Sequence, residues 1–153
     1  MKNVHQFEVT MLWNKPEAGT DKKQFKNHSV AIHNKPDLNI SAAKNFKGDA
    51  NLYNPEDLLL SGLVSCHFMS YLYCCSKYDI DVVSYTDAAQ AFLEVNDNDS
   101  GCITRVILQP RVVIKNKDQV ELANSLHTQA NQLCFIANSC NFIVEHQPIC
   151  TSL

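Results

Sequence analysis

The longest apolar run of the chain covers residues 54–78 and predicts a single buried helix. Residues typical of a helix N-terminus stand at its start, in the order Asn54, Pro55, Glu56 and Asp57. Residues 58–75 contain no Asp, Glu, Lys or Arg. A helix without a charged face must be covered on nearly all sides. We therefore expect a core helix that is shared between two subunits.

A membrane span is the alternative for this run, because its length approaches the roughly 20 apolar residues that a bilayer requires. Three serines, His67 and Gly62 interrupt the run, however, and the rest of the chain has the composition of a soluble protein. We therefore favour a core helix and expect no membrane partner.

The N-terminal part predicts an antiparallel meander of three strands. Loose alternation of β-branched and aromatic residues occurs in three segments, 5–14, 25–33 and 38–43. Turn-forming residues separate these segments, with Pro16 in the first turn and Pro36 in the second. Residues 44–53 are expected to form a loop that leads into the long helix.

Beyond the long helix, the pattern predicts a hairpin. Residues 81–95 and 102–115 are rich in β-forming residues, and residues 96–101 between them favour a turn. Pro110 cannot donate a ladder hydrogen bond, so we expect it to mark an edge or a bend in the second strand.

The segment 116–133 changes to a helical period. Its apolar residues fall on one stripe, formed by Val120, Ala123, Leu126, Ala130 and Leu133. Residues 141–149 then predict a last strand at 142–145, before Pro148. This order of elements indicates an α+β fold in which the helices pack on one face of an antiparallel sheet. The length favours a single domain over residues 1–153.

The composition limits which binding partners and which cellular compartment we expect for this protein. Thirteen basic and sixteen acidic residues, without a basic run, argue against a nucleic-acid partner. The N-terminal residues lack the apolar segment of a secretory signal, so we expect a cytoplasmic protein. The seven cysteines match neither a disulfide framework nor paired zinc ligands, so most are expected to be reduced thiols.

Cys66, in the middle of the long helix, is the strongest candidate for chemistry. Cysteine is among the most often buried residue types, so a packing role is the simplest alternative. Two other residues favour a reactive thiol. Cys134 ends the second helix, and the free amide hydrogens of a new helical turn after it would favour a thiolate. Glu56 is a carboxylate that can turn inward with the long helix.

Glu56 cannot reach Cys66 along an unbroken helix. The two residues are ten positions apart, which corresponds to about 15 Å along the axis. We therefore expect Glu56 to assist Cys66 across a two-fold interface, where the same patch of each subunit faces the other. A site built from two chains makes the dimer obligatory for activity.

Two motifs carry a resemblance to a known family. The segment Asn54-Pro55-Glu56-Asp57-Leu58-Leu59, followed by Ser65-Cys66-His67, resembles the helix signature of the OsmC and Ohr family of thiol peroxidases. The segment Cys134-Phe135-Ile136-Ala137-Asn138-Ser139 is similar to the second redox motif of one branch of that family. The predicted order of strands and helices agrees as well, so the resemblance covers nearly the whole chain.

The resemblance implies an OsmC-like fold and a homodimer with entwined subunits around two central helices. It also implies a peroxidase that reduces organic hydroperoxides without any cofactor or metal. In such an enzyme the Cys66 thiolate becomes a sulfenic acid, which condenses with Cys134 to a disulfide. A dithiol reductant, either a lipoyl protein or a thioredoxin-like protein, then restores the thiols. Glu56 matches the glutamate of the family site.

Two features depart from the family pattern. Phe135 follows Cys134, where many members have Pro. Better-known members use an arginine near the reactive sulfur, whereas Arg105 and Arg111 here both lie in the predicted hairpin strand. Lys26 or Lys47 is a candidate replacement, although a lysine lacks the guanidinium fork. The missing arginine leaves a second hypothesis open, a non-enzymatic small-ligand binding module or redox sensor on the same fold.

The remaining cysteines are weaker candidates. Cys74 and Cys75 are expected to pack in the core. Cys140 lies close to Cys134 in sequence and is an alternative resolving thiol. The other two, Cys102 and Cys150, are expected to be structural or exposed bystanders.

Two histidines lie near the candidate cysteines in sequence. His67 points about 100° away from Cys66 on the helix, so we expect a core or interface histidine rather than a base. His127 precedes Cys134 by seven residues and shares its helix face, which leaves a role in the site open.

Overall fold

The computed structural model describes residues 3–153, and the chain divides into two compact units. Unit 1 is Met1–Leu58 and unit 2 is Leu59–Leu153. The boundary falls in the first turn of the long helix, and each unit is described by itself. The single domain expected over residues 1–153 stays a prediction.

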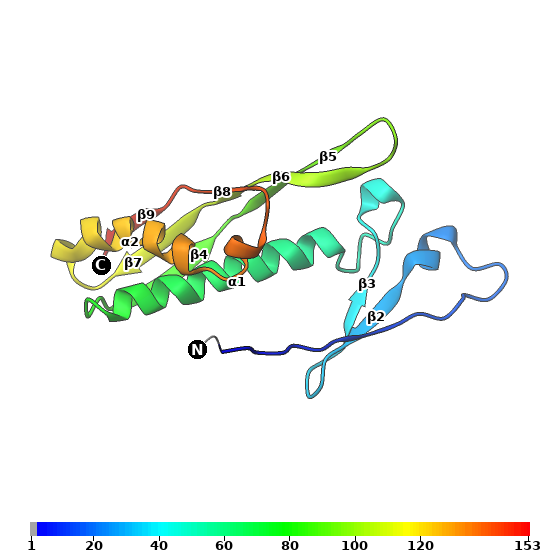
Figure 1. Ribbon diagram of the computed structural model, residues 1–153, viewed down its shortest axis with the longest axis horizontal. Helices are drawn as coiled ribbons and strands as arrows, with labels where there is room; N and C mark the ends of the chain where they lie inside the picture. The colour runs from blue at the N-terminus through cyan, green and yellow to red at the C-terminus, as the bar shows by residue number, and fades with distance from the viewer. Residues whose placement is uncertain (1–2) are drawn as a thin grey trace. The chain divides into compact units, whose positions relative to one another are not determined.

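Unit 1 contains the expected antiparallel meander (Figure 1). Its strands are β1 (Thr10–Leu12), β2 (His28–Ala31) and β3 (Leu38–Ile40), and each pairs antiparallel with the next. All three strands are shorter than predicted, and a short 3-10 helix, η1 (Lys22–Lys26), occupies the start of the expected second strand. Residues 3–9 form no strand, although their composition favours one.

The loop before the long helix contains a second 3-10 helix, η2 (Lys44–Phe46). Gly48 closes this loop, and a Cβ atom there would lie 1.7 Å from the Ala42 carbonyl oxygen. Only glycine fits at such a distance. Lys47, directly before it, adopts the left-handed conformation with φ 60°.

The long helix α1 (Pro55–Ser76) begins with a reciprocal cap. The Asn54 side-chain oxygen accepts a hydrogen bond from the Asp57 amide at 2.8 Å, and the Asp57 carboxylate accepts one from the Asn54 amide at 3.2 Å. The predicted helix over 54–78 is confirmed to within two residues. By length and composition alone α1 could cross a membrane, but a core helix of a soluble protein passes the same test.

Unit 2 contains six strands in two sheets rather than one long hairpin. One sheet has the order β4-β7-β9, formed by Val82–Asp87, Pro110–Ile114 and Ile149–Ser152. The other has the order β5-β6-β8, formed by Gln90–Val95, Gly101–Leu108 and Ile143–His146. Each predicted hairpin strand is therefore two strands. The expected bend at Pro110 is confirmed, since β6 ends at Leu108 and β7 starts at Pro110 in the other sheet.

The C-terminal segment forms two strands, β8 and β9, each at one edge of its sheet. The strand predicted at 142–145, before Pro148, is confirmed as β8, whereas β9, after Pro148, was not predicted. These two strands pair in parallel, β8 with β6 and β9 with β7, whereas the strands at the opposite edges, β4 and β5, pair antiparallel. The chain reaches these edges through the helix α2 (Val120–Leu133), and a helical crossover permits parallel pairing.

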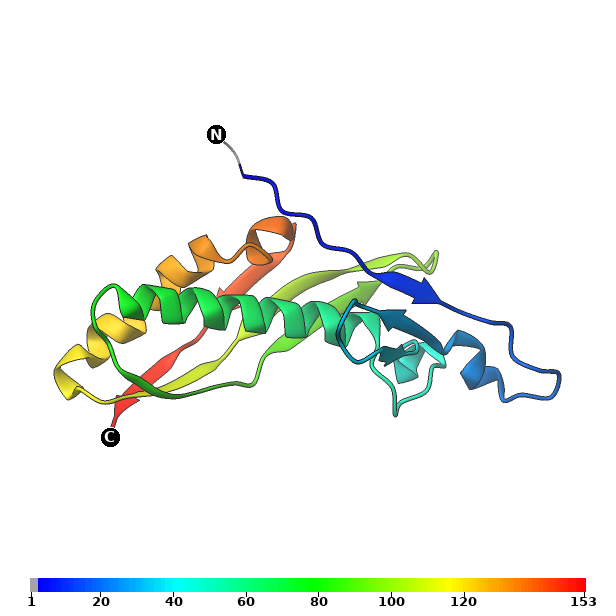
Figure 2. The same cartoon turned by 90° about the horizontal axis from the view of Figure 1, so that it is seen from below.

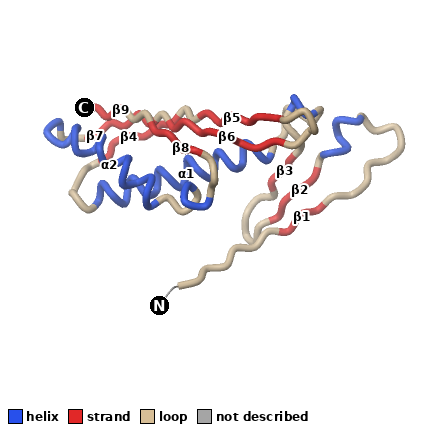
Figure 3. Tube along the Cα trace, turned by 45° about the horizontal axis from the view of Figure 1, so that its top comes forward, coloured by secondary structure: helices blue, strands red, loops and turns tan. Residues whose placement is uncertain are grey.

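The helices of unit 2 lie on one face of its strands, as the sequence predicts (Figure 3). Helix α1 runs along the strands (Figure 2), and α2 follows a short 3-10 turn, η3 (Lys117–Gln119). Most of the expected stripe of α2 faces inward, with Ala123 and Ala130 fully buried, but Leu133 at the end of the helix is exposed. Two apolar clusters result. One contains Tyr71, Cys75 and Cys150, and the other contains Leu63, Val106 and Cys134.

Candidate functional site

Cys66 lies at the edge of the buried face of α1. Leu63 and His67, on either side of it in sequence, are completely buried, whereas Cys66 itself is half-buried. Its side chain packs against the cluster around Leu63 and Cys134. The thiol is therefore held by core packing and is still partly accessible to solvent.

Cys134 lies directly after the last residue of α2, and its side chain is completely buried. The chain turns there into the 3-10 helix η4 (Ala137–Ser139), which confirms the predicted helical turn. The backbone amide of Ala137 donates a hydrogen bond to the Cys134 sulfur at 3.4 Å. The start of this turn thus fixes the position of the second thiol.

Packing brings Cys66 and Cys134 together from elements that are far apart in sequence. Cys66 is among the partly buried side chains packed against the cluster that contains Cys134. The neighbouring Cys66 thiol is also one of the groups that raise the pKa of Cys134. Both cysteines are free thiols, so the structure presents the reduced form of the pair.

The environment of Cys134 favours the thiol over the thiolate. Burial raises its pKa to about 11, although the amide of Ala137 acts in the opposite direction. The amides of the new turn act towards the thiolate, as expected, but the net shift favours the thiol. The amide hydrogen bond is present, but the loss of solvation is the larger effect.

The surroundings of the two thiols are rich in apolar side chains. They come from α1, from the strands β5, β6 and β8, and from the loops beside them: Leu60, Val64, Ala89, Ala91, Ile103, Phe142 and Val144. Beside Cys134, the side chain of Phe135 is 81% exposed. The thiols are therefore surrounded by the apolar side chains of the buried cluster, and the exposed Phe135 side chain adds apolar surface beside Cys134.

Glu56 is not brought to Cys66 within one chain. Both residues belong to the same unbroken helix, as the sequence predicts, so about 15 Å of helix separates them. The Glu56 Oε2 atom is shielded from solvent and has no hydrogen-bond partner among residues 3–153. This carboxylate oxygen is therefore buried without a hydrogen-bond partner among the described residues.

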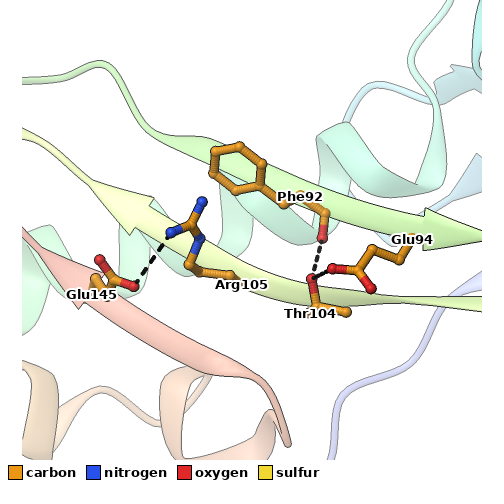
Figure 4. Close-up of polar contacts among 5 residues, drawn as sticks. All are labelled: Phe92, Glu94, Thr104, Arg105 and Glu145. Carbon is orange, nitrogen blue, oxygen red and sulfur yellow. Dashed lines mark hydrogen bonds and ion pairs between the residues drawn. The ribbon is translucent and has the colours of Figure 1, made fainter.

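Neither arginine belongs to the thiol site. Arg105 lies over the Phe92 ring at 4.3 Å and within 3.9 Å of a Glu145 carboxylate oxygen (Figure 4). Its neighbour Val106 packs with Cys134, and successive strand residues point to opposite faces, so Arg105 faces away from the thiols. Arg111 donates hydrogen bonds to the carbonyl oxygens of Pro110 and Gln147.

The two candidate lysines lie in unit 1. Lys26 is exposed, and its ammonium group donates a hydrogen bond to the Phe46 carbonyl oxygen. Lys47 is also exposed and follows the same short helix η2. Both lysines are therefore positioned by one loop region, and neither has an ion-pair partner in the part of the chain that the structure describes.

His67 and His127 form a buried pair, which the sequence did not predict. His67 Nε2 lies 3.0 Å from His127 Nδ1, and the Tyr71 ring stacks on His127 with centroids 4.0 Å apart. The expectation of a core histidine at position 67 is confirmed, and His127 hydrogen-bonds with it rather than with Cys134. Burial lowers the pKa of His67 to about 4 and that of His127 to about 3.

The other cysteines lie outside the thiol pair. Cys74, Cys75 and Cys150 are buried in the apolar cluster around Tyr71, and Cys102 is exposed. Cys140 is half-buried at the end of η4, and burial raises its pKa. Among the described residues, no group of three or more His, Cys, Asp or Glu side chains could hold a metal ion.

A hollow of about 430 Å³ flanks α1 in unit 2 but does not include Cys66. It is lined by Ser61, Val64, Ser65, Phe68, Tyr85, Thr86 and Asp87. The Asp87 carboxylate accepts hydrogen bonds from the Gln109 amide at 2.7 Å and from the Tyr85 hydroxyl at 3.3 Å. The bond from Gln109 ties β4 to the corner between β6 and β7, whereas the bond from Tyr85 lies within β4.

Comparison with known proteins identifies relatives over most of the chain. A family model described as OsmC-like protein matches residues 48–147. No curated protein sequence matches the chain. The structure is similar to that of an OsmC-like protein of unknown function from Vibrio cholerae O1 biovar eltor, with a TM-score of 0.84 and 27% identity. That match covers 95% of this chain and 100% of the other.

Two further structures share the fold at lower identity. An organic hydroperoxide resistance protein from Elizabethkingia anophelis, with thiocyanate bound, has a TM-score of 0.73 and 17% identity, and the match covers 100% of both chains. A putative organic hydroperoxide resistance protein from Vibrio cholerae, with captopril in one active site, has a TM-score of 0.67 and 22% identity. That match covers 98% of this chain and 94% of the other. The family resemblance seen in the sequence is confirmed.

Proposed function

Because the chain belongs to the family of OsmC-like proteins, we propose that it is a thiol-dependent peroxidase that reduces organic hydroperoxides. The observation that carries the proposal is the contact between two free thiols, Cys66 and Cys134, that are distant in sequence. The organic hydroperoxide resistance proteins that share the fold support the same substrate class.

The two thiols differ in exposure, and this difference suggests the order of the steps. The half-buried Cys66 sulfur attacks the terminal oxygen of the hydroperoxide as a thiolate, and the O–O bond breaks. The alcohol leaves after it takes up a proton, and Cys66 becomes a sulfenic acid. The buried Cys134 sulfur then attacks the Cys66 sulfur, which releases water and forms a disulfide.

An external dithiol completes the cycle. It attacks the Cys66–Cys134 disulfide, and a second exchange releases both protein thiols and leaves the reductant as a disulfide. Lipoyl and thioredoxin-like proteins are the two reductant classes that fit this step. The apolar side chains around the thiols favour a substrate with an apolar tail over hydrogen peroxide. We place this cycle in the cytoplasm.

Glu56 acts in this proposal from the partner subunit of a homodimer. It cannot reach the Cys66 of its own chain, and its Oε2 atom has no hydrogen-bond partner among the described residues. One face of α1 supports the dimer, because Met69 and Tyr73 are 59% and 56% exposed there. Lys26 or Lys47 supplies the positive charge that stabilises the attacking and departing oxygens.

The first test is consumption of cumene hydroperoxide and of hydrogen peroxide with a dithiol reductant. We expect turnover that favours the organic substrate and that the Cys66→Ser variant has lost. Cys102→Ser, which changes an exposed cysteine outside the site, serves as the matched control and should retain wild-type rates. Equal turnover by wild type and Cys66→Ser would overturn the proposal.

Subunit mixing tests the role of Glu56. Cys66→Ser and Glu56→Gln should each be impaired alone. A mixed dimer contains one site with an intact Cys66 and an intact Glu56 from the other chain. Mixing the two variants should therefore recover part of the wild-type rate, whereas mixing that leaves the rate unchanged would show that Glu56 does not act across the interface.

A second candidate function is a small-ligand binding module or redox sensor. It is favoured by one observation, that Arg105 and Arg111 are both held in contacts away from the thiols. Such a protein would be oxidised once by a hydroperoxide and would be reduced too slowly for turnover. A single stoichiometric oxidation without sustained consumption would favour this candidate over the peroxidase.

A further inference from the structure

Two exposed surfaces of opposite charge extend beyond the residues proposed for the thiol site. The first, here called the basic surface, belongs to the short helices η1 and η2 of unit 1 and consists of Lys22, Lys23, Lys26, Lys44 and Lys47. The hydrogen bond from Lys26 to the Phe46 carbonyl joins the two helices. Asp21 and Asp49 border this surface. Its five lysines outnumber these two carboxylates, so its net charge is positive.

The basic surface has no ion-pair partners within the described chain. The two ion pairs among residues 3–153 join Arg105 to Glu145 and Lys115 to Asp81, and both lie in unit 2. All five lysines of the basic surface are exposed. Clustered like charges repel one another, so this arrangement favours a negatively charged partner.

The second surface is the acidic turn of the β5–β6 hairpin, formed by Glu94, Asp97 and Asp99. The hydrogen bonds that hold the turn come from other groups. Asn96 Nδ2 donates to Ser100 Oγ at 2.9 Å, and the Ser100 hydroxyl donates to Asn98 Oδ1 at 2.6 Å.

The acidic side chains take little part in holding this turn. No hydrogen bond within residues 3–153 uses the carboxylates of Asp97 or Asp99, and Glu94 accepts one from the exposed Thr104 hydroxyl (Figure 4). The carboxylates are therefore free to face a partner.

We infer that the acidic turn of one copy docks on the basic surface of a second copy. The inference rests on the homodimer of the proposed function and names the contact that selects the partner. Under two-fold symmetry the contact occurs twice, because each copy presents both surfaces. Complementary charges of this kind mainly set register, partner choice and association rate.

A pair of charge-reversed variants tests the contact. The basic-surface variant carries Lys22→Glu, Lys23→Glu and Lys44→Glu, and leaves Lys26 and Lys47 intact because both are candidates for the thiol site. The acidic-turn variant carries Glu94→Lys, Asp97→Lys and Asp99→Asn. Asparagine at position 99 tolerates the left-handed conformation there, with φ 62°.

Each variant alone should dimerise at least about tenfold more weakly than the wild type, because like charges meet at both contacts. An equimolar mixture should recover, since the heterodimer pairs opposite charges at both contacts. Native mass spectrometry of the mixture should then show mainly heterodimer. Added salt should weaken this preference.

A control variant changes the same number of lysines outside the basic surface: Lys15→Glu, Lys35→Glu and Lys117→Glu. These residues are exposed, and the control should dimerise like the wild type. If the wild type is a dimer but the two mixed variants pair at random, the docking contact is overturned and the homodimer is not. A monomeric wild type would overturn the homodimer itself, and the contact with it, whereas peroxide turnover is measured separately.

Discussion

His67 Nε2 on α1 lies 3.0 Å from His127 Nδ1 on α2, and both side chains are completely buried. This pair joins the two helices that carry or precede the thiols. One nitrogen of each ring, His67 Nδ1 and His127 Nε2, has no partner among the described residues. The pair is therefore stable only while both rings are neutral.

The histidine pair predicts a loss of stability in acid. The folded pKa values, about 4 for His67 and about 3 for His127, lie below the ordinary value of 6.5. The unfolded chain therefore binds more protons, and the stability present above pH 6.5 decreases as the pH falls towards the folded values. Each histidine should contribute about 1.4 kcal/mol per pH unit in that range.

Urea unfolding at several pH values between neutral and mildly acidic measures this loss. His127→Gln should reduce the pH dependence, whereas His33→Gln, at an exposed position, should leave it unchanged. A free energy of unfolding that is the same at both ends of the range would contradict the assignment.

Replacement of Cys134 should stop the cycle after the first oxidation. In Cys134→Ser the Cys66 sulfenic acid has no neighbouring thiol, so dimedone should trap it and excess peroxide should oxidise it further. Cys140→Ser is the matched control, because Cys140 lies in the same loop and is the alternative resolving thiol. Loss of the disulfide in Cys140→Ser, but not in Cys134→Ser, would exchange the roles of these two cysteines.

Met69→Glu should separate the proposed dimer. This side chain is 59% exposed on the α1 face, and a carboxylate there cannot be buried against a second copy without a large cost. Sedimentation velocity should show a monomer with reduced peroxidase activity. Val83→Glu, at an exposed apolar position on β4, should remain dimeric. Dimeric Met69→Glu would place the interface elsewhere.

The cap of α1 should contribute measurably to stability. Asn54→Ala removes the acceptor of the Asp57 amide hydrogen bond and should lower the free energy of unfolding by about 1 kcal/mol. Asn54→Asp keeps an acceptor at the same position and should lose much less. Chemical denaturation distinguishes the two variants, and equal losses would show that the cap hydrogen bond is not the cause.

Much of the fold could be predicted from local signals. The start of α1 is encoded in Asn54 and Pro55, and the turn before β6 in a run of Asn, Asp and Ser ending at Gly101. The division of the hairpin into four strands was missed because Asp87 and Gln109 resemble ordinary strand or turn residues. Their role depends on a hydrogen bond between distant positions, at 2.7 Å.

Only part of the candidate site could be predicted, because the rest also depends on contacts between distant positions. Motifs on two helices indicate Cys66 and Cys134, but the burial that raises the pKa of Cys134 follows from tertiary packing. The parallel edges formed by β8 and β9 also depend on where the chain returns after α2. The buried histidine pair was missed because the period of each helix reveals a face but not which faces meet.

The central claim is that Cys66 and Cys134 form the redox pair, and one measurement tests it most directly. The reduced wild-type protein is treated with one equivalent of cumene hydroperoxide, the remaining thiols are alkylated, and linked peptides are mapped by mass spectrometry. We predict one equivalent of cumyl alcohol and a single disulfide between Cys66 and Cys134. Alcohol formation with both of these cysteines still alkylated, or a disulfide between other cysteines, would contradict the account.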